Sequence, residues 1–232
     1  MNPLSLASAA VGAASAAIST PEHVASTARR SVALGLNQGS SGNISARSGE
    51  GFLITPSGRE MSELSAAEIV TVGMDGQYPE GVKPSSEWRF HRDLYVSFPE
   101  ARAVVHAHSP FAVALACLRR DLPPFHYMVA QAGGTDVRCA PYAPFGTQAL
   151  SDAVIAALQG RRACLMANHG LLTWGRSLAG ALALALEVEA LCGQYLRASQ
   201  AGVPVLLTDA EMAEVLEKFK DYGAQDCGAT DS

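Results

Sequence analysis

Three histidines in this 232-residue chain have the spacing expected of residues that bind one metal ion. His106 and His108 lie in Val104-Val105-His106-Ala107-His108, and His169 follows a second apolar segment. Alternate residues of a strand face the same side, so a His-x-His pair directs two imidazoles into one space. Such a pair could also be two core imidazoles bonded to backbone carbonyls, but His169 after a neighbouring strand favours the metal. Three imidazoles with one open position are typical of catalytic zinc, whereas structural zinc is closed by four ligands.

A carboxylate and two serines provide a second set of polar groups in Ser85-Ser86-Glu87. Ser85 or Ser86 is predicted to cap a helix that runs to about Phe98. Taken alone, the triplet is an ordinary helix start with an acidic residue favoured by the helix dipole. Beside the histidines, Glu87 becomes a candidate fourth ligand or general base, and the helix start a candidate anion site.

Two polar turns could bind a phosphate through backbone N–H groups and hydroxyls. They are the Gly-rich segment 37–43 and Thr55-Pro56-Ser57-Gly58. Neither is a Walker loop, because the Gly-Lys-Ser/Thr ending is missing, and a Gly-rich turn alone is weak evidence. Together with the serine-capped helix, the two turns favour a phosphate-bearing small molecule as the ligand. The remaining histidines, His23, His91 and His126, are expected on helix surfaces or in loops.

The elements that must position these residues follow from hydrophobic spacing, caps and turns. Helices and strands alternate irregularly along the chain, which predicts one α/β domain rather than two. A first helix is expected from the Thr20 cap to about Leu36. Strands are expected at 44–46, 51–54, 69–72, 103–108, 137–140, 162–166 and 171–174, and further helices at 85–98, from 110, at 147–158, at 177–199 and from 208 to about 223.

Composition limits the class of protein. The chain has 48% hydrophobic and 17% charged residues and a net charge of −5, which is typical of a globular domain without a nucleic-acid-binding face. The apolar segment 178–186 is too short to span a membrane. Five cysteines without a Cys-x-x-Cys pair favour a reducing, cytoplasmic location. Residues 1–19 are expected to form an Ala/Ser-rich tail rather than a signal peptide, leaving 20–232 as the domain.

Read together and in order, the motifs resemble the class II aldolase and adducin-head family, over about residues 22 to 223. The segments that carry the resemblance are 35–43, Leu53-Ile54-Thr55-Pro56-x-Gly58, Pro84-Ser85-Ser86-Glu87-Trp88-Arg89-Phe90-His91, Ala103-Val104-Val105-His106-x-His108, His126-Tyr127-Met128, Ala132-Gly133-Gly134, 139–147, His169-Gly170-Leu171 and 215–223. The resemblance implies an α/β fold with a central mixed, mostly antiparallel sheet flanked by helices, assembled as a cyclic homotetramer.

The resemblance also implies roles for individual residues. Zn²⁺ would be held by His106, His108, His169 and Glu87, with Mn²⁺ or Co²⁺ as alternatives, and Glu87 would also move a proton. Tyr127, contributed by a neighbouring subunit, would donate a proton to the aldehyde. The substrate phosphate would contact Gly42, Asn43, Ser57, Gly58, Ser85 and Ser86, and the aldehyde pocket would be shaped by Phe145, Phe219 and Tyr222.

The implied reaction is reversible cleavage of a ketose 1-phosphate, such as L-fuculose 1-phosphate, to dihydroxyacetone phosphate and an aldehyde such as L-lactaldehyde. Breaking the C3–C4 bond requires a stabilised enediolate, for which a metal is a suitable Lewis acid. The sequence does not decide whether the sugar is a fuculose, a ribulose or a deoxy-sugar phosphate.

Two alternatives use the same scaffold differently. A dehydratase, decarboxylase or 4-epimerase would keep the metal, but the epimerase needs an acidic relay residue where Phe125-His126-Tyr127-Met128 resembles the aldolase version. A non-catalytic scaffold like the adducin head would not need the ligand set that this chain retains.

Overall fold

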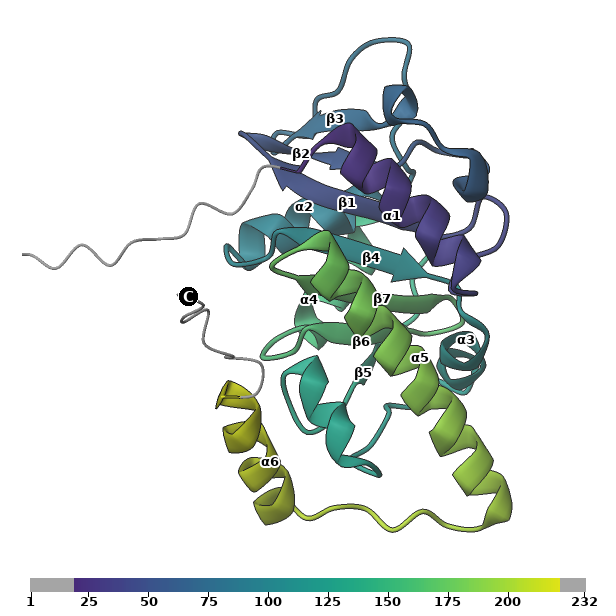
Figure 1. The fold of residues 1–232 in the computed structure, drawn as a ribbon, viewed down its shortest axis with the longest axis vertical. Coiled ribbons are helices and arrows are strands. Elements are labelled where there is room, and N and C mark those ends of the chain that lie inside the picture. Colours follow the sequence, from purple (N-terminus) through teal and green to yellow (C-terminus); the bar gives the residue numbers. More distant parts are fainter. Residues whose placement is uncertain (1–18, 222–232) are drawn as a thin grey trace, which may run out of the picture.

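Seven strands form one sheet in the computed structural model, which describes residues 19–221 (Figure 1). The sheet order is β3-β2-β1-β4-β7-β6-β5, and every neighbouring pair is antiparallel except the parallel pair β5–β6. The predicted mixed, mostly antiparallel sheet is therefore confirmed. The strands are β1 (Asn43–Ser48), β2 (Gly51–Ile54), β3 (Val70–Gly73), β4 (Ala103–Ala107), β5 (Arg138–Ala140), β6 (Ala163–Met166) and β7 (Gly170–Gly175).

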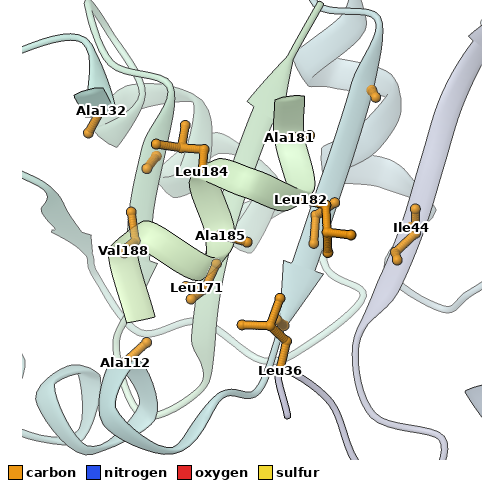
Figure 2. Close-up of a cluster of buried hydrophobic side chains, with 14 of the residues drawn as sticks. Leu36, Ile44, Ala112, Ala132, Leu171, Ala181, Leu182, Leu184, Ala185 and Val188 are labelled. Carbon is orange, nitrogen blue, oxygen red and sulfur yellow. The ribbon is translucent and has the colours of Figure 1, made fainter. Parts of the chain in front are cut away.

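One face of the sheet is covered by α1 (Pro21–Ala33), α3 (Pro110–Cys117) and α5 (Leu178–Ala201), with α1 and α5 in front in Figure 1. Figure 2 shows Leu182, Ala185 and Val188 of α5 among the buried side chains of this face, close to Leu171 of the sheet. By length and composition, α5 could cross a membrane. Its apolar side packs on the sheet instead, so it is the central helix of this core.

The opposite face is covered by α2 (Trp88–Ser97) and α4 (Gln148–Ala157). Val104 packs in this second cluster and Val105 in the first, because successive residues of β4 point to opposite faces. His106 has the same parity as Val104 and therefore points toward α2, where its ring stands edge-on to Phe90. Strand alternation thus places the ring of His106 on the side of the sheet that α2 covers.

Several helix boundaries differ from the predicted ones. α1 ends at Ala33 rather than near Leu36; Leu36 is buried after the helix, where its N–H is bonded to the Ser31 carbonyl. The caps predicted at Thr20, Thr147 and Ser177 are confirmed, as each side chain accepts a backbone N–H.

The remaining elements are three short 3₁₀ helices and α6. They are η1 (Met61–Glu63), η2 (Ala66–Glu68), η3 (Tyr127–Ala132) and α6 (Asp209–Asp221). The predicted tail up to residue 18 and the helix end near Gly223 lie outside the described residues.

Candidate metal centre

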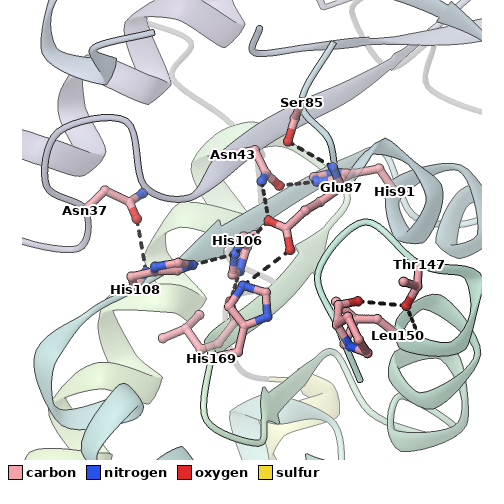
Figure 3. A network of polar contacts seen from close by, with 12 residues as sticks. Asn37, Asn43, Ser85, Glu87, His91, His106, His108, Thr147, Leu150 and His169 are labelled. Atoms are coloured by element: carbon pink, nitrogen blue, oxygen red, sulfur yellow. Dashed lines mark hydrogen bonds and ion pairs between the residues drawn. The ribbon is translucent and has the colours of Figure 1, made fainter. Parts of the chain in front are cut away.

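The three imidazoles named from the sequence lie together at one end of the sheet (Figure 3). His106 is the next-to-last residue of β4, His108 directly follows the strand, and His169 lies in the turn between β6 and β7. Because β7 pairs with β4, this turn is held beside the end of β4. The ligand nitrogens of the three histidines all lie within 4.8 Å of one another, so one ion can contact all of them.

The histidines present the neutral nitrogen that a metal requires. Nδ1 of the fully buried His106 lies 2.8 Å from the Leu171 carbonyl, which can only accept, so Nδ1 carries a proton and Nε2 is turned toward His108. Burial, with the neighbouring imidazoles, lowers the pKa of His108 to about 3 and that of His169 to about 4. Both rings are therefore neutral at physiological pH, as metal ligands must be.

Glu87 is the N-cap residue of α2, so the predicted cap at Ser85 or Ser86 is wrong by one or two residues. Its side chain makes no capping bond, and the Ser85 hydroxyl accepts the Glu87 N–H instead. The carboxylate is thereby free to face the histidines: Oε2 lies 3.2 Å from His106 Nε2, and Oε1 lies 3.3 Å from His169 Nε2.

An orphaned oxygen tests whether a metal fits this arrangement. Oε1 of Glu87 is buried but makes no hydrogen bond with any residue that the structure describes. Burial alone would raise the pKa of Glu87, but His106, His169 and the amide of Asn43 outweigh it and lower the pKa to about 2. An ionised, under-bonded carboxylate next to three imidazoles is a donor set that fits a divalent cation.

A chain of buried hydrogen bonds holds the Glu87 carboxylate in its orientation (Figure 3). Asn43 donates from Nδ2 to Glu87 Oε2 at 2.9 Å, and its Oδ1 accepts from Nε2 of His91. The other ring nitrogen of His91 accepts from the Ser45 hydroxyl at 2.7 Å, which in turn lies 2.8 Å from the Tyr95 hydroxyl. Burial lowers the pKa of His91 to about 3, so the ring stays neutral and can both donate and accept.

His91 was expected at a helix surface, and this prediction is wrong because the ring is fully buried. The sequence did contain a signal: His91 is four residues after Glu87, so the two share one side of α2. Asn37 is a second residue without a predicted role. Its Oδ1 accepts the His108 N–H at 3.0 Å. A Cβ on Gly42, whose φ is +76°, would lie 2.3 Å from that oxygen, so glycine is required there.

A pocket of about 320 Å³ opens beside the imidazoles. Hydroxyls and Gly-rich backbone form one wall, and no described residue of its lining is Lys or Arg. Besides Glu87, His108 and His169, it includes seven residues predicted to contact the substrate: Gly42, Asn43, Ser57, Gly58, Ser85, Ser86 and Phe145. It also includes Ser40, Ser41, Tyr142 and Asn168, for which no role was predicted.

Two residues predicted to act on the substrate, Tyr127 and Phe219, are not among the described residues that line this pocket. Tyr127 lies in η3 with 51% of its surface exposed, and Phe219 lies on α6, which packs against η3. Tyr222 is outside the described residues. The single chain therefore presents the imidazoles, the carboxylate and the hydroxyl wall, but not the phenol.

The comparisons with known proteins agree over most of the chain. Residues 22–196 match the family model described as Class II Aldolase and Adducin N-terminal domain. The 5-methylthioribulose-1-phosphate/5-deoxyribulose-1-phosphate aldolase of Rhodospirillum rubrum is 52% identical over 196 residues, which cover 84% of this chain and 89% of that protein. The L-fuculose phosphate aldolase of Escherichia coli strain K12 is 49% identical over 191 residues, covering 82% and 89%. A solved structure named L-fuculose 1-phosphate aldolase has a TM-score of 0.84 and 39% identity, covering 89% of this chain and 99% of that one.

Proposed function

We propose that this chain, which belongs to the class II aldolase and adducin N-terminal domain family, reversibly cleaves a ketose 1-phosphate to dihydroxyacetone phosphate and an aldehyde. The observation that carries the proposal is the under-bonded Glu87 carboxylate facing three imidazoles, beside a pocket walled by hydroxyls and Gly-rich backbone. The imidazoles and the carboxylate match the donor preferences of Zn²⁺, with Mn²⁺ or Co²⁺ as alternatives.

When bound, the divalent metal supplies a Lewis acid for the negative charge that develops on the ketose oxygens as the C3–C4 bond breaks. Glu87 carries the proton that leaves or joins C3, since its carboxylate lies at the site and is ionised. Asn43 and His91 keep one carboxylate oxygen in place while the other remains free for the proton. The chain's own residues thus divide the work between holding the metal and moving the proton.

The phosphate of the ketose is held by hydroxyls and backbone N–H groups rather than by cations. Ser57 and Gly58 of one turn, and Ser85 and Ser86 before α2, lie on neighbouring segments that line the same pocket. Oriented N–H dipoles bind anions without a net positive charge, which agrees with the chain's charge of −5.

The similar proteins are named for different sugar phosphates, which gives two candidate aldehyde products. Cleaving L-fuculose 1-phosphate between C3 and C4 would release L-lactaldehyde, and 5-deoxyribulose 1-phosphate would release acetaldehyde. The 52% identity to the 5-methylthioribulose and 5-deoxyribulose phosphate aldolase favours testing the smaller sugar beside fuculose. Phe145 and Tyr142, both exposed at the pocket rim, are placed to contact the part of the sugar that differs.

Two further features belong to the proposed enzyme. A cyclic homotetramer would bring the exposed Tyr127 of one subunit to the pocket of the next, where it would protonate the aldehyde oxygen. A cytoplasmic location fits the four described cysteines, which are all free thiols.

The test is release of dihydroxyacetone phosphate from each of the two ketose 1-phosphates by zinc-loaded protein, followed with a coupled dehydrogenase. We expect cleavage of at least one, and its loss in the variant His106→Ala together with the bound metal. Absence of dihydroxyacetone phosphate from both sugars, with folded and metal-replete protein, would reject the proposal.

A further inference from the structure

We propose that a second cavity, at the opposite end of the sheet from the metal centre, is a binding site for a small molecule with more than one phosphoryl group. Its volume is about 540 Å³. It is bounded by α1, the β1–β2 hairpin, Arg102 before β4, and the turn from β7 into α5. Arg102 and His108 are six positions apart along extended chain, so this cavity lies about 20 Å from the metal centre.

Four arginines from four different segments line the cavity: Arg30, Arg47, Arg102 and Arg176. Its lining contains no Asp or Glu among the described residues. Within residues 19–221, none of these arginines forms an ion pair with a carboxylate. Guanidinium groups bind phosphate oxygens in a planar, bidentate manner, so four of them without a counter-charge are typical of a polyanion site.

Arg47 is held in place rather than free to turn into solvent. Its guanidinium lies 4.9 Å from the ring centre of Tyr95 and donates to the backbone carbonyls of Tyr95 and Ala101. Burial lowers the pKa of Arg47, and the nearby positive charge of Arg102 lowers it further. Arg102 is exposed beside the held guanidinium of Arg47, and the repulsion between these two positive charges is relieved when an anion binds between them.

The first turn of α5 adds uncharged donors to the same cavity. Ser177 caps the helix by accepting the Gly180 N–H, which leaves the N–H groups of Leu178 and Ala179 without partners inside the helix. Both residues line the cavity at the positive end of this 24-residue helix. The side chains of Leu178 and Leu182 give the cavity one apolar wall, which suits a metabolite better than a bare inorganic ion.

Calorimetry with inorganic phosphate on the zinc-loaded full chain tests the site. We expect two phosphates per chain, one at each cavity, and only one in the double variant Arg102→Gln/Arg176→Gln, whose ketose-phosphate cleavage is unchanged. The matched control Arg120→Gln/Arg197→Gln removes the same charge from exposed positions outside the cavity and should keep both phosphates. The single variant Arg30→Gln, at an exposed position of α1, tests the site independently and should weaken the second phosphate about tenfold or more.

A non-ketose bisphosphate, glucose 1,6-bisphosphate, distinguishes a metabolite from a simple anion. Binding about tenfold or more tighter than inorganic phosphate, lost in the double variant, supports the proposal. Equal phosphate stoichiometry in wild type and double variant would overturn it. So would a change in oligomeric state of the double variant by sedimentation without loss of phosphate, because the arginines would then bind carboxylates of another subunit.

Discussion

At the residue scale, the environment of Glu87 determines what the candidate site can do. Its carboxylate is buried and ionised, has one oxygen bonded to Asn43, and has the other facing imidazoles without a hydrogen bond to any described residue. That second oxygen is available to bind a metal ion or to accept a proton. The same atom arrangement therefore supports both roles proposed for Glu87, as ligand and as proton carrier.

Replacing Glu87 with Gln separates these two roles. The amide keeps the shape and the contact with Asn43 but cannot carry the proton. We expect the variant to retain part of its metal and to lose turnover about 10²-fold or more. Metal content by atomic emission and kcat from the cleavage assay measure the two effects. Wild-type turnover in this variant would exclude Glu87 as the proton carrier.

Acid should destabilise the metal-free protein through its buried histidines. In the folded chain the pKa values of His91, His108 and His169 are about 3, 3 and 4, against an ordinary value of 6.5. Between pH 6.5 and about 4 the unfolded chain binds protons that the folded chain excludes, so the free energy of unfolding falls as pH falls, by up to about 1.4 kcal/mol per pH unit for each proton. Urea unfolding in chelator at pH 7, 6 and 5 measures the slope.

The variant His91→Gln is the control for that pH dependence. It removes one of the three titrating groups while leaving a polar side chain beside Asn43. Its slope of unfolding free energy against pH should be smaller than the wild-type slope. Equal unfolding free energies of the wild type at pH 7 and pH 5 would contradict the assignment of these histidines as neutral in the folded state.

The sequence predicted the three imidazoles because spacing in β4 and the position of His169 depend only on local periodicity. It did not predict the chain through Asn43, His91, Ser45 and Tyr95, since these contacts join residues about 45 to 50 positions apart. A lone histidine on an amphipathic helix does not reveal whether it faces water or a sheet. That answer came only from the packing of α2.

At the element scale, β4 and β7 set the distance between the imidazoles. Gly170 begins β7 directly after His169 and pairs with Met166 of β6, while the next residue, Leu171, pairs with Ala107 at the end of β4. A Cβ there would lie 2.4 Å from the Ala107 carbonyl and 3.2 Å from the His108 ring. The glycine therefore permits the close approach of two strands on which the three-histidine cluster depends.

The variant Gly170→Ala should disturb the metal centre through the backbone. We expect a loss of about 1–3 kcal/mol in the free energy of unfolding, together with weaker zinc binding. Gly202→Ala is the matched control, because a Cβ at Gly202 meets nothing within 4 Å and its backbone is extended. Its effect should stay within about 0.5 kcal/mol. An unchanged zinc affinity in Gly170→Ala would contradict this prediction, because it would show that β4 and β7 can move apart without disturbing the metal centre.

Most elements were predictable, and the main error was informative. Caps at Thr20, Thr147 and Ser177 were identified because a hydroxyl before an apolar run is a local signal. The start of α2 was placed too early because Ser85 and Ser86 carry the same signal, yet the Ser85 hydroxyl accepts the N–H of Glu87 and the helix begins only at Trp88. Both serines line the candidate pocket, so the local signal for a cap was read at a position that the proposed site uses.

At the scale of the whole molecule, the site of one chain lacks the phenol of Tyr127. Half of that side chain is exposed on η3, away from the pocket lining. Two inactive variants should therefore restore activity when they are mixed in one oligomer. At a restored site, the Tyr127→Phe subunit supplies an intact Glu87 and a neighbouring Glu87→Gln subunit supplies an intact Tyr127. Unfolding and refolding a mixture should restore roughly a quarter of the wild-type turnover in a random cyclic assembly. No restored activity from confirmed hybrid oligomers would place each site within one chain.

The central claim is that this protein removes a proton from C3 of dihydroxyacetone phosphate at a metal centre that contains Glu87. Incubating zinc-loaded protein with dihydroxyacetone phosphate in D₂O, and following the C3 proton by NMR, tests this step without knowing the aldehyde. The proposed function predicts exchange that stops on chelation and slows about 10²-fold or more in Glu87→Gln. Absence of exchange from folded, zinc-replete protein would contradict it.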